Sequence, residues 1–200
     1  GSCISPILGC TNNTAVNYNP QANTSIANGG ALDNLFSTGG YFNGDQYLIF
    51  DSDFICLIKS AKFYADSNNT VTFELRDNNG NVIDDTTITV SSGKQTLYLD
   101  FDIPIGIDLQ LGLGTINAAL YKNNDGAIFP YIISNLVSVT GANNAGTQNN
   151  WYNYYNLQFK EKCISDFSEV TAVFIESLTN NNFSEKKISI YPNPANNSIN

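Results

Sequence analysis

Histidine and methionine are absent from the 200-residue sequence, and arginine occurs only once. Without histidine, the Ser-His-Asp and Cys-His arrangements of common hydrolases cannot form, and neither can zinc sites with histidine ligands. The nine basic residues face 18 acidic ones, and the resulting net charge of −9 would repel a phosphate backbone. These absences exclude most hydrolase mechanisms and argue against nucleic acid as a partner.

Long apolar runs are also missing. The apolar runs that occur, such as residues 47–50, are far too short to cross a bilayer, so we expect no transmembrane helix and no membrane insertion. The chain opens with Gly1-Ser2-Cys3 and carries no signal peptide, so we expect any leader to lie upstream. Only 14% of the residues are charged and asparagine is abundant, a composition that favours an extracellular protein.

The sequence does contain the alternation that is typical of strands. Val71, Phe73 and Leu75 alternate with polar neighbours, and the pattern recurs over residues 97–101. Turn sequences such as residues 77–80, Asp-Asn-Asn-Gly, separate these runs at short intervals. We therefore predict an all-β fold, an antiparallel β-sandwich of the jelly-roll or immunoglobulin-like kind, with irregular appendages at both termini.

Three segments resemble parts of bacterial proteins that are exported by the type IX secretion system. Residues 188–197, Ile-Ser-Ile-Tyr-Pro-Asn-Pro-Ala-Asn-Asn, are similar to the opening of the C-terminal sorting domain of such proteins. Residues 9–22 are similar to a short cysteine repeat found in them, and residues 47–159 resemble a β-sandwich module that is common among them. The resemblance implies an extracellular or outer-surface protein that meets the type IX secretion machinery during export.

The composition of each segment and the resemblance together divide the chain into four parts. We expect a cysteine-repeat segment over residues 1–30 and the β-sandwich over residues 31–176. Residues 177–187 offer little to bury and are predicted to be a linker. Residues 188–200 are then the truncated start of the sorting domain.

The four cysteines are more easily explained by disulfides than by a metal site, because none falls in a Cys-x-x-Cys pair and no histidine is present. Cys3 and Cys10 are close enough in sequence to pair with each other. This leaves Cys56 and Cys163, which we predict to join an early core strand to the end of the tyrosine-rich strand. The alternative is that Cys56 is a free, buried thiol between two apolar residues.

The sharpest candidate for ligand binding is the strand that begins at Trp151. Strand alternation divides it into an apolar face (Trp151, Asn153, Tyr155, Leu157, Phe159) and a polar face (Tyr152, Tyr154, Asn156, Gln158, Lys160). If the first face meets the core, the second presents two tyrosines flanked by amides, a set suited to stacking on sugar rings. The alternative is that Tyr152 and Tyr154 pack on a neighbouring loop or on the N-terminal segment.

The acidic residues are weaker candidates for metal binding or catalysis. Asp51, Asp53 and the series Asp100, Asp102 and Asp108 could supply oxygen ligands to calcium, although solvated turn aspartates explain them better. We expect no other cofactor, and a glycosidase would need two carboxylates facing each other in a cleft.

Residues 85–87, Asp-Thr-Thr, look like the O-glycosylation sequon used by bacteria with this secretion route. This resemblance predicts glycan attachment at Thr86.

The sequence thus favours a non-catalytic accessory module that binds polysaccharide or a cell-surface glycan, or mediates adhesion, through an exposed tyrosine strand. The rival hypothesis is a structural spacer or an extracellular matrix or filament subunit that packs on sister domains. Whether Tyr152 and Tyr154 are exposed or covered distinguishes the two.

Overall fold

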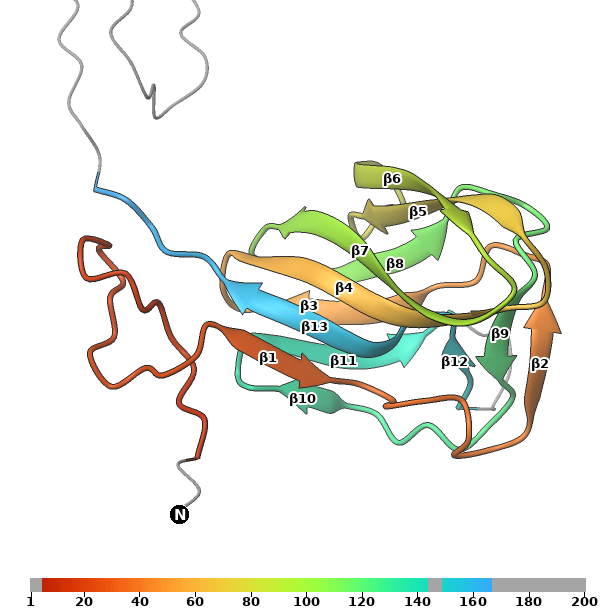
Figure 1. The fold of residues 1–200 in the computed structure, drawn as a ribbon, viewed down its shortest axis with the longest axis horizontal. Helices are drawn as coiled ribbons and strands as arrows, with labels where there is room; N and C mark the ends of the chain where they lie inside the picture. Colours follow the sequence, from red (N-terminus) through yellow and green to blue (C-terminus); the bar gives the residue numbers. More distant parts are fainter. Residues whose placement is uncertain (1–4, 144–148, 167–200) are drawn as a thin grey trace, which may run out of the picture.

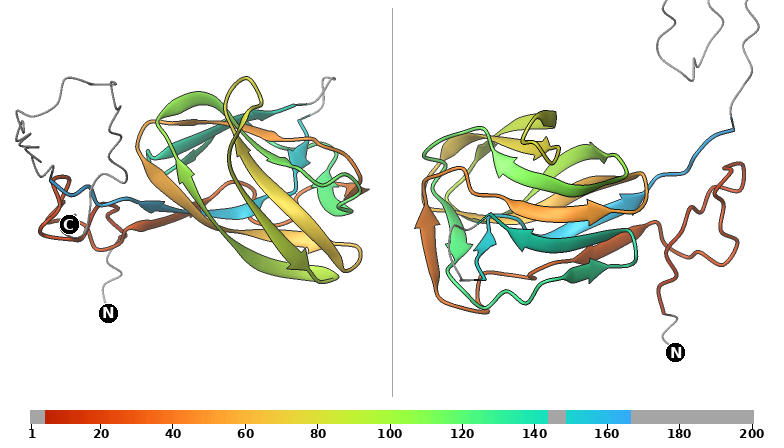
Figure 2. Two further views of the ribbon diagram at one scale, coloured as in Figure 1. Left: turned by 90° about the horizontal axis from the view of Figure 1, so that it is seen from above. Right: turned by 180° about the vertical axis from the view of Figure 1, so that it is seen from behind.

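The computed structural model of the chain describes residues 5–143 and 149–166, which form strands and turns without a helix. Two antiparallel sheets pack face to face, so the predicted β-sandwich is confirmed (Figures 1 and 2). Among these residues there is no helix of the length and apolarity needed to span a membrane.

The first sheet has seven strands. Its centre is the long strand β4, which pairs with β13 on one side and β7 on the other. Strand β9 pairs with the end of β4, where Leu120 lies opposite Ala65. Strands β2 and β12 in turn pair with β9. The bounds are β1 Ile26–Gly29, β2 Gly39–Phe42, β4 Cys56–Ala65, β7 Gly93–Ile103, β9 Leu120–Asn123, β12 Trp151–Tyr152 and β13 Tyr155–Glu161.

The second sheet has six strands in the order β10-β11-β3-β8-β5-β6. Its bounds are β3 Leu48–Ser52, β5 Asn69–Arg76, β6 Val82–Val90, β8 Gly106–Leu113, β10 Tyr131–Ile133 and β11 Val137–Ala142. The β5–β6 hairpin turns on Asp77, whose Oδ1 accepts the N–H groups of Asn79 and Asn81, while Gly80 takes the left-handed conformation at φ 85°.

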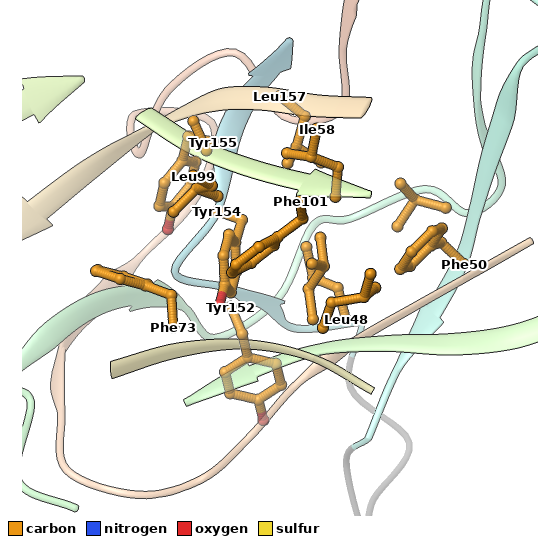
Figure 3. Close-up of a cluster of buried hydrophobic side chains, with 14 of the residues drawn as sticks. Leu48, Phe50, Ile58, Phe73, Leu99, Phe101, Tyr152, Tyr154, Tyr155 and Leu157 are labelled. Atoms are coloured by element: carbon orange, nitrogen blue, oxygen red, sulfur yellow. The ribbon is translucent and has the colours of Figure 1, made fainter. Parts of the chain in front are cut away.

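The core lies between the two sheets. Strand β5 alternates buried Val71, Phe73 and Leu75 with more exposed residues, as the sequence pattern predicts. Aromatic side chains from both sheets meet there: the ring centroids of Phe63 on β4 and Phe73 on β5 lie 4.7 Å apart. Figure 3 shows part of this cluster. The buried side chains of the two sheets form one continuous core.

The N-terminal segment is only partly separate from the sandwich. Residues 26–29 were predicted to belong to the cysteine-repeat segment, but they form β1 and pair with β13. Residues 5–25 are irregular and lie at the end of the sandwich where β13 leaves it (Figure 1). Asn17 holds them there, because its Nδ2 donates to the Lys162 carbonyl and its Oδ1 accepts from the Ile164 N–H, both at 2.8 Å.

The disulfide prediction was wrong. Cys10 is bonded to Cys163, with an S–S distance of 2.04 Å, and Cys56 is a free, buried thiol. The physical reason is that Cys56 begins β4 and points into the core, whereas Cys163 lies beyond β13, where residues 5–25 fold back against it. Cys3 lies outside the described residues, as do the predicted linker and the start of the sorting domain.

Candidate functional site

The predicted tyrosine platform is not exposed. Trp151 and Tyr154 are fully buried, and Tyr152 keeps only 3% of its surface. The rings of Phe63 and Phe73 lie 5.2 and 6.1 Å from that of Tyr154, whose hydroxyl donates to the Gly112 carbonyl. Figure 3 shows Tyr152, Tyr154 and Tyr155 among the core side chains. The interpretation of Tyr152 and Tyr154 as an exposed sugar-stacking pair is therefore wrong.

The reason is a break in the strand. Asn153 and Asn156 adopt left-handed backbone conformations, with φ of 55° and 43°, so β12 ends at Tyr152 and β13 starts at Tyr155. Asparagine tolerates this conformation better than most residues. The two-residue alternation is lost at the break, and tyrosines expected on opposite faces are all covered.

The remaining predicted site residues serve local structure. Trp151 donates from Nε1 to the Tyr154 carbonyl at 2.9 Å and stacks on Phe129. Asn156 donates its backbone N–H to the Ala31 carbonyl. The Gln158 side chain bonds to Asn28 on the neighbouring strand β1. The structure does not bring these residues together at the surface.

A different set of tyrosines lies on the outer face of the first sheet. Tyr41 on β2 is directly opposite Tyr121 on β9, and the pairing of Ala65 with Leu120 makes Tyr64 on β4 the next neighbour of Tyr121. Ring centroids are 5.5 Å apart for Tyr41 and Tyr121, and 6.3 Å apart for Tyr121 and Tyr64. Tyr41 is 50% exposed and the other two are half-buried. We call Tyr41, Tyr121 and Tyr64 the tyrosine row.

The rings of the tyrosine row do not form one plane. Tyr41 and Tyr121 meet edge to face at 90°, and Tyr121 and Tyr64 at 62°. Each junction therefore presents a ring face beside a ring edge, so the three rings do not make a flat platform. Gly39 makes room for Tyr121, since a Cβ there would lie 2.7 Å from a carbon atom of the Tyr121 ring.

The Tyr64 hydroxyl of the tyrosine row lies in a partly buried setting. Burial raises the pKa of Tyr64, and the negative charge of Asp33 adds to this effect while the backbone of Asn34 opposes it. A neutral phenol both donates and accepts hydrogen bonds. The row thus combines apolar ring faces with polar groups.

Sequence reasoning missed the tyrosine row because its members come from three distant segments. Tyr64 could have been found, since it occupies an outward position on a strand that alternates. Tyr41 and Tyr121 lie on four-residue strands, which are too short for an alternation signal. Their adjacency exists only in the sheet.

The aspartates considered as calcium ligands are spread over the molecule. Asp51 accepts the backbone N–H of Asp108, Asp100 pairs with Lys59, and Asp102 pairs with Lys162. Within residues 5–143 and 149–166, no three acidic, cysteine or histidine side chains are grouped so as to hold a metal ion.

Thr86 is on the edge strand β6 opposite Phe73 and is partly buried. Its side chain consequently lies on the core-facing side of the edge. Glycan attachment there stays a prediction.

Comparison of the chain with protein-family models, with curated proteins and with solved structures finds no match.

Proposed function

We propose that this chain is a non-catalytic accessory module of a secreted or cell-surface bacterial protein, exported by the type IX route, and that it binds a polysaccharide or cell-surface glycan through the tyrosine row. The observation that carries the proposal is the alignment of Tyr41, Tyr121 and Tyr64 across three neighbouring strands on the outer face of a sheet. Tyrosine rings stack on the apolar faces of sugars, and their hydroxyls bond to sugar hydroxyls.

The charge of the molecule supports a neutral ligand. The net charge of −9 disfavours phosphate-rich and strongly acidic polymers, whereas a neutral polysaccharide meets no such repulsion. The absence of histidine supports a binding role over a catalytic one.

Affinity electrophoresis and calorimetry against neutral polysaccharides, including xylan, β-glucan, mannan and chitin oligomers, test the proposal. Tyr41→Ala and Tyr121→Ala should each weaken binding about tenfold or more, because tyrosines at binding centres are frequent hot spots. Tyr41→Phe keeps the ring and removes the hydroxyl, so it distinguishes the contribution of stacking to binding from that of hydrogen bonding.

The matched control is Tyr18→Ala, which removes a tyrosine of similar exposure, 41%, from the N-terminal segment. Loss of binding in all three alanine variants, or in none of them, would contradict the assignment to the tyrosine row.

A second candidate, the structural spacer or matrix subunit, is favoured by an apolar surface at the end of the sandwich where β13 leaves. Five large apolar side chains there are between 47% and 68% exposed: Phe54, Ile55, Ile105, Ile107 and Ile132. Phe54 and Ile132 line an open hollow of about 490 Å³. Wild-type protein that binds none of the polysaccharides but associates with neighbouring domains would favour this candidate.

A further inference from the structure

Residues 31–38, which we call the rim loop, connect β1 to β2 and cross the outer face of the first sheet. Lys62 on β4 donates from Nζ to the Leu32 carbonyl at 2.7 Å. Asn123 on β9 is fully buried and donates from Nδ2 to two carbonyls of the loop, that of Asn34 among them at 3.0 Å. The rim loop is therefore fixed to two strands of the sheet.

The rim loop borders the tyrosine row on one side. Lys62 and Tyr64 are two residues apart on β4, and on β9 the same spacing separates Asn123 from Tyr121. Side chains two residues apart on a strand point to the same face, about 7 Å from each other. Because the loop is bonded to Lys62 and Asn123, it lies one such step from the two tyrosines.

Polar groups of the tyrosine row lie on the side of the rim loop. A Cβ at Gly39, the first residue after the loop, would lie 2.9 Å from the Tyr121 hydroxyl. The Tyr64 hydroxyl is hydrogen-bonded to the backbone of Asn34 and lies near the charged side chain of Asp33. A ligand beside the loop would thus meet hydroxyl groups as well as ring faces.

The rim loop carries apolar side chains that are more exposed than the row. Leu32 and Leu35 are 64% and 82% exposed, whereas Tyr121 and Tyr64 are half-buried. The Asp33 Oδ1 accepts the Leu35 N–H at 2.9 Å, which holds the turn at the exposed leucines. A flat surface laid on this face meets the leucines before it meets the half-buried rings. A single polymer chain can instead lie beside the loop and contact both.

We propose that the rim loop restricts the ligand of the tyrosine row to single, soluble glycan chains and excludes crystalline polysaccharide surfaces. The inference rests on the proposed function and specifies the form of its ligand. The chain lies across the strands, with Leu35 against its apolar side and the row beneath it. The 90° and 62° angles between neighbouring rings of the row agree with this, because a crystalline face needs coplanar rings.

Soluble hexasaccharides and insoluble particles of the same polymers test the proposal: cellulose, chitin, mannan, xylan and β-1,3-glucan. Calorimetry measures binding of the hexasaccharides, and depletion from solution measures binding to the particles. Wild type should bind at least one hexasaccharide and stay in solution with the crystalline form of that polymer. Leu35→Ala should weaken hexasaccharide binding about fivefold or more, because it removes an apolar contact.

The matched control is Ile107→Ala, which removes a side chain that is 68% exposed at the start of β8. This position lies at the other end of the sandwich, since β8 begins opposite the end of β3 while the row lies where β4 ends. Ile107→Ala should bind as wild type does. Equal loss in the Leu35 and Ile107 variants overturns the proposal, and so does Leu35→Ala that binds like wild type.

The outcomes also separate this inference from the proposed function. Wild type that binds crystalline particles as well as, or instead of, hexasaccharides overturns the role of the rim loop. If Tyr41→Ala and Tyr121→Ala weaken binding while Leu35→Ala does not, the role of the rim loop is wrong and the proposed function stands. Wild type that binds neither hexasaccharides nor particles overturns both.

Discussion

At the scale of single residues, the only arginine of the sequence bonds to two carboxylates and a backbone carbonyl. Arg76 pairs with Asp45 at 2.7 Å and with Glu74 at 2.5 Å, and its Nη2 donates to the Leu113 carbonyl at 3.0 Å. Its side chain is only 10% exposed and lies against Gly112, where a Cβ would come within 2.8 Å of the guanidinium. A planar fork with several donors suits this site, and a lysine ammonium does not.

Arg76→Ala should destabilise the sandwich by about 3 kcal/mol, because it leaves the largely buried Glu74 carboxylate without its partner. Arg76→Lys should recover only part of this loss. Urea unfolding measures both, with Lys160→Ala as a control at an exposed lysine. Equal stability of Arg76→Ala and wild type would show that the pairing contributes nothing.

At the scale of elements, the Cys10–Cys163 disulfide and Asn17 attach the N-terminal segment to the end of β13. The bonded cysteines are 153 residues apart, and closing so long a loop stabilises a fold by about 5 kcal/mol on the chain-entropy model. The strands themselves do not depend on this bond, since the core between the sheets holds them.

The double variant Cys10→Ser with Cys163→Ser should therefore lower the melting temperature while the sheets persist, and limited proteolysis should cut first within residues 5–25. Asn17→Ala should make that cleavage faster still. Peptide mapping without reductant is the direct check: burial raises the pKa of the Cys56 thiol, which should be alkylated only after unfolding. A peptide that joins Cys56 to Cys163 would contradict the structure.

At the scale of the whole molecule, buried tyrosines make stability depend on alkaline pH. Burial raises the pKa of Tyr154 and of Tyr155 well above the ordinary value for tyrosine. The folded state thus keeps protons that the unfolded chain loses above about pH 10. The two protonated tyrosines contribute fully to the free energy of unfolding below about pH 10. Above that pH, the free energy of unfolding falls by about 1.4 kcal/mol per pH unit for each of the two tyrosines.

Alkaline titration followed by tyrosinate absorbance and circular dichroism should accordingly show two phases. Exposed members of the set of 11 tyrosines ionise first, and the buried ones ionise only as the sheets unfold. Tyr154→Phe should flatten the pH dependence, because it removes one of the groups that titrate. A single reversible phase with the sheets intact would mean that the core tyrosines are accessible.

The sequence by itself determined the fold class and the turn between β5 and β6, because alternation and turn chemistry are local. Val71, Phe73 and Leu75 repeat every second residue, and Asp77 and Gly80 form their turn with near neighbours. The expectation that Tyr152 and Tyr154 form an exposed sugar-binding pair came from the same local pattern.

Only the tertiary structure decided which tyrosines are exposed and which cysteines are bonded. Left-handed Asn153 and Asn156 turned the predicted platform inward, and sheet topology brought Tyr41, Tyr64 and Tyr121 together. Cys10 reached Cys163 because the N-terminal segment folds back to the end of β13. Each of these outcomes depends on contacts between residues far apart in the chain, and a periodic pattern within one strand carries no information about them.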